Sequence, residues 1–313
     1  MRPQDNHVED AVPRETCEAC DGKRLGASFR IIDRTGFEYE MVCCSDCGLL
    51  QFSRVLSAGK TDHVAWEGDW WDQPTPAYDE NRRSFYLPLL DILSDCGIRE
   101  GKLLDVGCSF GGLMEAAREK GLSVCGVDIS EQVLEYLRTK KSMDAYRTIS
   151  EAVTCKGLFD VVTCVSTLFY LRHPLRELFA IRAALAPGGT LIVDLQANRG
   201  WIVRLWRWLL SIVGKKLVVQ HGQVMHNLLN ASYYAFNTRN LQRIIERAGF
   251  RIVAVRNTRR RRPRVKNFRS LCLAVLAACH DSLSKTASVL TGGRVNPARC
   301  LTIVAQRRRE SLL

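Results

Sequence analysis

The sequence predicts an α/β protein in which a small cysteine-bearing module precedes a doubly wound, seven-stranded sheet. Three observations lead to this prediction. Two Cys-x2-Cys pairs lie within the first 50 residues. Apolar strands alternate with amphipathic helices from about residue 100 onwards. A glycine-containing loop joins the first of these strands to its helix, and an acidic residue ends the second strand, as in nucleotide-binding folds of this class.

Composition narrows the classes of protein that fit. The chain has 313 residues, 46% hydrophobic and 25% charged, which is ordinary for a globular protein and excludes collagen-like or wholly disordered classes. The longest uncharged apolar run, 271–279, is far shorter than the roughly 20 residues of a transmembrane helix. The N-terminus is polar and has no signal-peptide core, and thirteen cysteines suit a reducing compartment. We therefore expect a cytoplasmic protein.

Positive charge is concentrated in the C-terminal third of the chain. Residues 198–313 contain 23 Lys and Arg but 3 Asp and Glu, a net charge of +20, whereas residues 1–197 carry −8. This excess favours an anionic partner such as lipid head groups, a phosphorylated substrate or nucleic acid. A solvated basic face that only aids solubility is the alternative. The Trp-rich basic segment 201–216 suits either an interfacial membrane helix or a lid over a pocket, and four arginines follow at 259–262.

Four cysteines near the N-terminus have the spacing of a structural zinc site: Cys17, Cys20, Cys44 and Cys47. Each Cys-x2-Cys turn can direct two sulfurs to one tetrahedral metal, whereas free thiols that fall in pairs by chance are the alternative. Residues between the pairs alternate around Thr35-Gly36, which predicts a β-hairpin. Cys43 adjoins the second pair; the spacing favours Cys44 without settling the choice. Four thiolates leave no open coordination position, so we expect a structural zinc ribbon over residues 1–60.

The next part of the chain predicts a site for a nucleoside. A linker and a covering helix occupy 61–100, and the apolar strand Lys102–Val106 then runs into a loop with Gly107 and Gly111. There a ligand can lie against bare backbone at a helix N-terminus. Asp128 ends the next strand, 21 positions after Gly107, where a carboxylate can accept hydrogen bonds from both ribose hydroxyls. The loop lacks the second glycine of a dinucleotide site and the Gly-Lys-Ser/Thr of a triphosphate site.

Three stretches, in this order, resemble the class I S-adenosylmethionine-dependent methyltransferases. The strings LLDVGCSFGG at 103–112 and GVDIS at 126–130 are similar to motif I and the acidic strand end of that family. Residues 158–195 are similar to its fourth strand, helix, Pro-Gly-Gly turn and fifth strand. The resemblance covers about residues 85–257 and implies a Rossmann-like fold with S-adenosylmethionine as cofactor. The implied domain has the following bounds: residues 101–313, with insertions at about 198–230 and 257–299.

The resemblance also implies which residues bind the cofactor: Asp105, Gly107, Cys108, Gly111, Asp128, Ile129 and Cys164. The motif I residues are expected to receive the methionine half of the cofactor. Asp128 is expected to hold the ribose and Ile129 to contact the adenine. Cys164, Val165 and Ser166 end the fourth strand, so they are expected to face the sulfonium.

A four-cysteine ribbon before such a domain is similar to a bacterial subgroup of this family. That subgroup includes sugar methyltransferases and enzymes of surface-polysaccharide or secondary-metabolite pathways. This chain has Phe169-Tyr170 where the subgroup often has Glu-His, and Tyr234 where it has a later His. We therefore expect Tyr170, Tyr234 and His226 to orient or deprotonate the methyl acceptor, although each fits a packing role equally well.

The expected function is S-adenosylmethionine-dependent methyl transfer to a small-molecule, sugar or lipid-linked acceptor. We also expect a structural zinc ion and peripheral association with an anionic membrane. An RNA methyltransferase is the alternative that the ribbon and the basic C-terminal third favour, but the ribbon is acidic and no RNA-reading module is recognisable. A non-catalytic binder on the same fold is a third alternative, and the intact set of cofactor residues argues against it.

Overall fold

The computed structural model divides into two compact units. The ribbon unit comprises Met1–Gln73, Phe169–Pro174 and Ala197–Ile244, and the α/β unit comprises Pro74–Leu168, Leu175–Gln196 and Ile245–Leu313. Within them the structure describes residues 11–32, 38–56, 76–196, 233–257, 286 and 300–308. The ribbon unit thus includes two segments that the sequence assigned to the second domain. The expected insertions, about 198–230 and 257–299, lie almost entirely outside the described residues.

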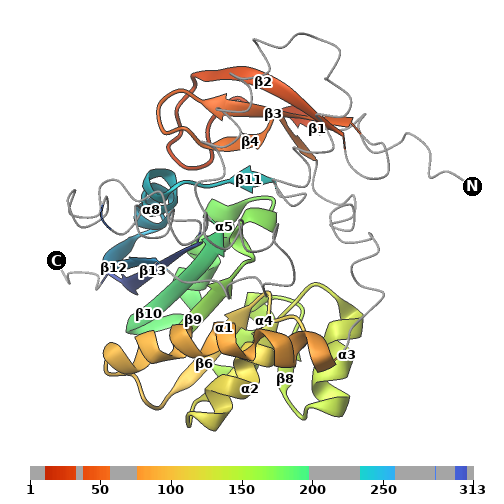
Figure 1. The fold of residues 1–313 in the computed structure, drawn as a ribbon, viewed down its shortest axis with the longest axis vertical. Helices are drawn as coiled ribbons and strands as arrows, with labels where there is room; N and C mark the ends of the chain where they lie inside the picture. Colours follow the sequence, from red (N-terminus) through yellow and green to blue (C-terminus); the bar gives the residue numbers. More distant parts are fainter. Residues whose placement is uncertain are drawn as a thin grey trace, which may run out of the picture. The chain divides into compact units, whose positions relative to one another are not determined.

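A seven-stranded mixed sheet forms the centre of the α/β unit (Figure 1). Its strands lie in the order β12-β13-β10-β9-β6-β7-β8. Their bounds are β6 Lys102–Val106, β7 Ser123–Val127, β8 Asp144–Tyr146, β9 Phe159–Val165, β10 Leu185–Gln196, β12 Phe250–Asn257 and β13 Cys300–Arg307. Strands β8, β7, β6, β9 and β10 pair in parallel, while β13 is antiparallel to both its neighbours. The expected Rossmann-like sheet of seven strands is therefore confirmed.

Helices precede and connect these strands. Their bounds are α1 Pro76–Asp95, α2 Gly112–Glu119, α3 Glu131–Lys140, α4 Ile149–Lys156, η2 Leu168–Tyr170, α5 Pro174–Ala184 and α8 Thr238–Arg247. Side chains fix the starts of two of them: Ser130 Oγ accepts a hydrogen bond from the amide of Val133, and Thr148 Oγ1 from that of Glu151. Each cap satisfies an amide that has no partner inside its helix. The covering helix expected within residues 61–100 is confirmed as α1.

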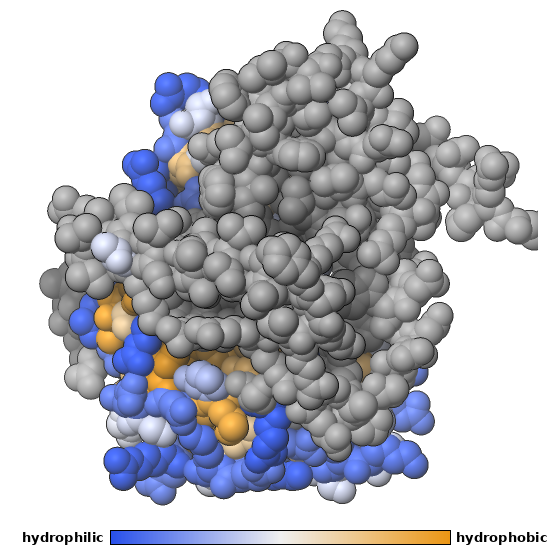
Figure 2. Space-filling model, viewed as in Figure 1, coloured by the Kyte–Doolittle hydropathy of each residue, from blue (hydrophilic) through white to orange (hydrophobic). Residues whose placement is uncertain are grey.

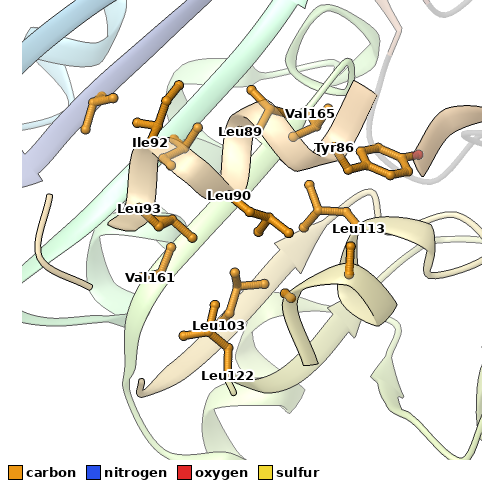
Figure 3. Close-up of a cluster of buried hydrophobic side chains, with 14 residues drawn as sticks. Tyr86, Leu89, Leu90, Ile92, Leu93, Leu103, Leu113, Leu122, Val161 and Val165 are labelled. Carbon is orange, nitrogen blue, oxygen red and sulfur yellow. The ribbon is translucent and has the colours of Figure 1, made fainter. Parts of the chain in front are cut away.

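The core of the α/β unit lies where α1 and α2 pack on the sheet (Figure 3). Helix α1 contributes Leu89, Leu90 and Leu93, whose helical spacing gives one apolar stripe. On the sheet, Leu103 of β6 pairs with Val161 of β9, so these two side chains share the face that α1 covers. The whole cluster comprises Tyr86, Leu89, Leu90, Ile92, Leu93, Leu103, Leu113, Ala116, Ala117, Leu122, Val161, Val165, Ile192 and Val304.

The ribbon unit contains a four-stranded antiparallel sheet in the order β11-β4-β3-β2. The strands are β2 Leu25–Ile32, β3 Glu38–Cys44, β4 Leu50–Phe52 and β11 Tyr234–Ala235, and a separate pair is formed by β1 Ala11–Pro13 and β5 Arg54–Leu56. The hairpin expected between the cysteine pairs is confirmed as β2 and β3. Strand β11 was not expected. Tyr234 pairs with Gln51 and Ala235 with Leu50, so a distant segment completes the ribbon's sheet.

The described surface of the α/β unit is mostly hydrophilic on the face drawn in Figure 2, with a smaller hydrophobic area. One exposed apolar side chain is Leu87 of α1, at 37%. Among the described residues, we find no helix that combines the length and apolarity required to cross a bilayer. The segments 201–216 and 259–262 lie outside the described residues, so the membrane and lid interpretations stay predictions.

Truncation of Leu90 should destabilise the α/β unit more than truncation of Leu87 on the same helix. Leu90 is 1% exposed and Leu87 is 37% exposed. Leu90→Ala opens a cavity between α1 and the sheet, so it should lower the free energy of unfolding by about 2–5 kcal/mol. Leu87→Ala should cost less than about 1 kcal/mol. Urea unfolding followed by circular dichroism measures both, and equal losses would contradict this packing.

Candidate functional site

The loop after β6 is held against the ends of two neighbouring strands. Its backbone is left-handed at Gly107 (φ 75°) and Ser109 (φ 47°). A Cβ on residue 107 would overlap the side chain of Thr167, two residues after β9, so both the dihedral angle and the space require glycine. The amides of Gly107 and Cys108 both donate to Val127 O, at 2.8 and 3.1 Å. The loop therefore lies at the carboxyl ends of β7 and β9.

Asp128, directly after β7, connects two loops through its carboxylate. Its Oδ2 accepts a hydrogen bond from the amide of Ser109 and its Oδ1 from that of Ser130, each at 3.0 Å. Each carboxylate oxygen keeps a second lone pair, so the group can also accept hydrogen bonds from two ribose hydroxyls. Burial raises the pKa of Asp128, and the amide donors partly oppose this shift. The side chain of Ile129 is 38% exposed, which leaves it accessible to an adenine ring.

Asp105, Cys108 and Cys164 are buried in or beside the sheet. Asp105 is 3% exposed, and its Oδ1 accepts a hydrogen bond from Thr163 Oγ1 at 2.7 Å. The sulfur of Cys108 lies over β7, where a Cβ on Gly126 would come within 2.6 Å of it. Burial raises the pKa of both thiols, which suits packing rather than nucleophilic chemistry. The expected position of Cys164 toward a sulfonium stays a prediction.

Ser166, directly after β9, combines a strained backbone with a buried hydroxyl. Its φ of 57° is unusual for a residue other than glycine. Its amide donates to Asp194 O of β10 at 2.6 Å. Its Oγ is buried and has no hydrogen-bond partner among the described residues. Strained and unsatisfied groups of this kind cluster at ligand sites, so Ser166 marks the carboxyl end of β9 as part of the candidate site.

The four expected metal ligands gather at one point of the ribbon unit. Their Sγ atoms all lie within 4.8 Å of one another. Cys17 and Cys47 are 3.5 Å apart, and Cys20 and Cys44 are 3.6 Å apart. Tetrahedral zinc with bonds of about 2.3 Å requires sulfurs about 3.8 Å apart, so this cluster fits the metal. Cys44 belongs to the cluster and Cys43 does not.

Two tight turns of the same kind present the cysteine pairs. In the first, the amide of Asp21 donates to Cys17 O at 2.8 Å, and in the second the amide of Gly48 donates to Cys44 O at 2.9 Å. Asp21 and Gly48 are both left-handed, with φ of 61° and 75°. The hydrogen bond that Cys17 shares with Cys47, and then burial, raise the pKa of Cys17, and a bound metal would take the place of the thiol proton.

The three residues expected at the methyl acceptor have different environments. Tyr234 is 1% exposed; its hydroxyl donates to Arg172 O at 2.6 Å and accepts from Arg14 Nη2 at 2.9 Å. Burial raises the pKa of Tyr234 well above its ordinary value. These contacts favour a positioning role over the expected role as a base. Tyr170 ends η2, is partly buried and belongs to the same unit, whereas His226 lies outside the described residues.

The structure therefore separates the expected residues into two groups. The residues expected to bind the cofactor lie at the carboxyl ends of β6, β7 and β9 in the α/β unit, and the four cysteines meet in the ribbon unit. Sequence reasoning missed several polar residues around both groups: Arg14, Thr163, Thr167, Arg172, Asn237 and Asn240. Only the two asparagines carry a usable signal, because Asn237 stands just before a helix, where Asn is a preferred cap, and Asn240 follows three residues later.

Comparisons with known proteins identify the family to which this geometry belongs. A family model described as a methyltransferase domain matches residues 78–255, more than half of the chain. The chain is 32% identical over 178 residues to a ubiquinone biosynthesis O-methyltransferase of Methylococcus capsulatus, covering 55% of this chain and 70% of that protein. It is 31% identical over 157 residues to the protein of the same name from Azoarcus sp. (strain BH72), covering 48% of this chain and 65% of that protein.

Solved structures of similar shape include two methyltransferases with S-adenosylhomocysteine bound. Magnesium protoporphyrin IX methyltransferase from Synechocystis PCC 6803 has a TM-score of 0.46 and 14% identity, covering 75% of this chain and 89% of that one. An N-methyltransferase from Bradyrhizobium japonicum has a TM-score of 0.43 and 15% identity, covering 78% and 94%. The family match and the sequence relatives confirm the expected resemblance, and the chain belongs to the class I S-adenosylmethionine-dependent methyltransferase family.

Proposed function

We propose that the protein transfers the methyl group of S-adenosylmethionine to a hydroxyl group of a small-molecule or lipid-linked acceptor. The observation that carries the cofactor assignment is the Asp128 carboxylate, which fastens the glycine loop at the carboxyl end of β7 through the amide of Ser109. The acceptor class is supported by the two relatives, which are named for ubiquinone biosynthesis and O-methylation.

Each part of the site has its own task in this reaction. Asp128 would accept hydrogen bonds from the ribose hydroxyls, and Ile129 would contact the adenine. Gly107 lets the backbone approach the methionine half, whose carboxylate suits the amides at the start of α2, where Gly111 provides no side-chain cap. The cofactor, when bound, supplies a methyl group on a positively charged sulfur. The protein supplies positioning, which contributes most of the rate acceleration in such a transfer.

Transfer to a hydroxyl forms an O–C bond as the S–C bond breaks, leaves S-adenosylhomocysteine and releases one proton. A base must take that proton as the bond forms or before it. Tyr170 and His226 stay candidates for this step, whereas the Tyr234 hydroxyl is already engaged on both sides. The buried Oγ of Ser166, at the carboxyl end of β9, suits a hydrogen bond that orients the acceptor hydroxyl.

A lipid-linked acceptor would also account for the net charge of +20 over residues 198–313. Basic residues and tryptophans together favour a surface with anionic head groups. Peripheral membrane association and a cytoplasmic location nevertheless rest on the sequence, and both stay predictions.

We further propose that the ribbon unit holds one structural zinc ion through Cys17, Cys20, Cys44 and Cys47. The sulfur spacing and the two matching turns support this assignment. Because all four ligands are thiolates, the metal would order the ribbon and would take no part in methyl transfer.

Replacing Asp128 should weaken cofactor binding without unfolding the α/β unit. In Asp128→Asn an amide replaces one of the two accepting oxygens, so the affinity for S-adenosylhomocysteine should fall about 10- to 100-fold. Asp144→Asn is the matched control, because Asp144 is an exposed residue on β8 whose carboxylate pairs with Lys156; it should change the affinity less than about two-fold. Isothermal titration calorimetry measures both. Equal affinities for all three proteins would remove the ribose assignment.

Freshly purified protein should contain a single zinc ion per chain. Cys44→Ser should lose the metal, because Cys44 belongs to the sulfur cluster. Cys43→Ser should keep the metal and serves as the control one position away. Elemental mass spectrometry against protein concentration measures both variants. The zinc assignment is wrong if unchelated protein carries no zinc, or if both variants lose it alike.

The methyl transfer itself can be tested without knowing the acceptor. Purified protein is incubated with an extract of small molecules and lipids and with S-adenosylmethionine that carries a deuterated methyl group. Mass spectrometry should find a product heavier by one labelled methyl group with wild type and not with Asp128→Asn. Label that appears only in RNA would instead support the nucleic-acid alternative.

A further inference from the structure

A chain of hydrogen bonds connects the first cysteine pair to residues 169–174 within the ribbon unit. Glu18 lies between the two cysteines of that pair, and its Oε2 accepts a hydrogen bond from Arg14 Nη1 at 3.0 Å. Arg14 Nη2 donates to the hydroxyl of Tyr234 at 2.9 Å. That hydroxyl donates to Arg172 O at 2.6 Å. The backbone of the 169–174 segment is thus bonded to the metal-binding turn through three side chains.

This chain of bonds is shielded from solvent. The side chains of Arg14 and Glu18 are 8% and 15% exposed, and Tyr234 is 1% exposed. Arg14 Nε also donates to Phe52 O at 3.1 Å, and its guanidinium carbon lies 5.5 Å from the centre of the Tyr234 ring. Charge-assisted hydrogen bonds in such surroundings are strong and geometrically specific. Removing one side chain from this chain of bonds is therefore expected to weaken the hydrogen bonds that follow it.

The second cysteine pair makes a separate connection. The carbonyl of Cys47 accepts hydrogen bonds from the side-chain amides of Asn237 at 3.3 Å and Asn240 at 3.5 Å. The two asparagines also bond to each other's backbone amides, at 2.8 and 3.0 Å, around the start of α8. Both cysteine pairs therefore hold parts of the chain far from them in sequence.

Residues 169–174 and Tyr234 both belong to connections that begin at the carboxyl ends of parallel strands. Residue 169 comes four positions after the carboxyl end of β9, and Tyr234 lies in the part of the chain that leaves the carboxyl end of β10. Doubly wound sheets bind their ligands outside the carboxyl ends of the strands. Chain connectivity alone thus links residues 169–174 to the carboxyl end of β9.

We propose that Tyr234 is a positioning residue through which the metal-loaded ribbon fixes the 169–174 segment. That segment carries Tyr170 and follows Ser166, so its conformation would govern how a methyl acceptor is held. This consequence rests on the proposed function, whereas the coupling between the metal site and the segment does not. When zinc is lost, the turn around Glu18 loses its order, and the bonds through Arg14 and Tyr234 lose their anchor.

Hydrogen–deuterium exchange on the full-length, zinc-loaded protein tests the coupling. Tyr234→Phe keeps the ring and removes the hydroxyl, so amides in the 169–174 segment should exchange about five- to ten-fold faster. Zinc content should be unchanged, and the affinity for S-adenosylhomocysteine should stay within about two-fold. Tyr233→Phe is the matched control: this ring packs edge-on against Phe52, and the residue is not in the chain of bonds. Chelation of zinc from wild type should accelerate exchange in the same segment.

Two results would overturn the proposal: unchanged exchange at 169–174 in Tyr234→Phe, or equal acceleration in Tyr233→Phe. Loss of zinc from Tyr234→Phe would overturn it as well, because the residue would then be holding the ribbon itself. If Tyr234→Phe fails to fold, Arg14→Lys gives the same comparison, since an ammonium cannot make the three directed bonds of the guanidinium. None of these measurements needs methyl transfer, so a failure to bind S-adenosylhomocysteine would refute only the proposed function.

Discussion

The candidate cofactor site depends above all on the two hydrogen bonds that the carboxylate of Asp128 accepts. By accepting hydrogen bonds from the amides of Ser109 and Ser130, the carboxylate fastens the loop after β6 to the loop after β7. The left-handed backbone at Gly107 and Ser109 persists because these bonds, and those to Val127 O, hold it in place. The bare backbone of the glycine loop and the Asp128 carboxylate therefore both lie at the carboxyl ends of β6 and β7, where a nucleoside could contact the two together.

A second constraint comes from the way the ribbon unit is assembled. It is built from three distant parts of the chain, and β11 shows this most directly because Tyr234 pairs with Gln51 of β4. A zinc module that only preceded the methyltransferase domain would need no such pairing. The chain that leaves β9 and β10 passes through this unit before it returns to the sheet. In our proposal the order of the metal site is thereby linked to the conformation of residues 169–174.

Much of the α/β unit could be predicted because its signals are local. Strand β6 has the bounds expected from an apolar run that ends at a glycine loop, and the Cys-x2-Cys spacing itself encodes the metal-binding turns. Strand β11 could not be predicted, because two residues carry no periodicity and their partner strand is remote in sequence. The chemistry of Tyr234 likewise does not say whether its hydroxyl meets a substrate or Arg14. Nor does any neighbour of Ser166 in the sequence signal its left-handed backbone.

The central claim is that the loops at the carboxyl ends of β6, β7 and β9 bind the nucleoside of S-adenosylmethionine. A crystal structure of the full-length protein with S-adenosylhomocysteine tests it most directly. Both ribose hydroxyls should lie within about 3 Å of the Asp128 carboxylate, with the adenine against Ile129 and the thioether facing Ser166. A nucleoside bound elsewhere, or a ribose whose hydroxyls do not reach Asp128, would contradict the account.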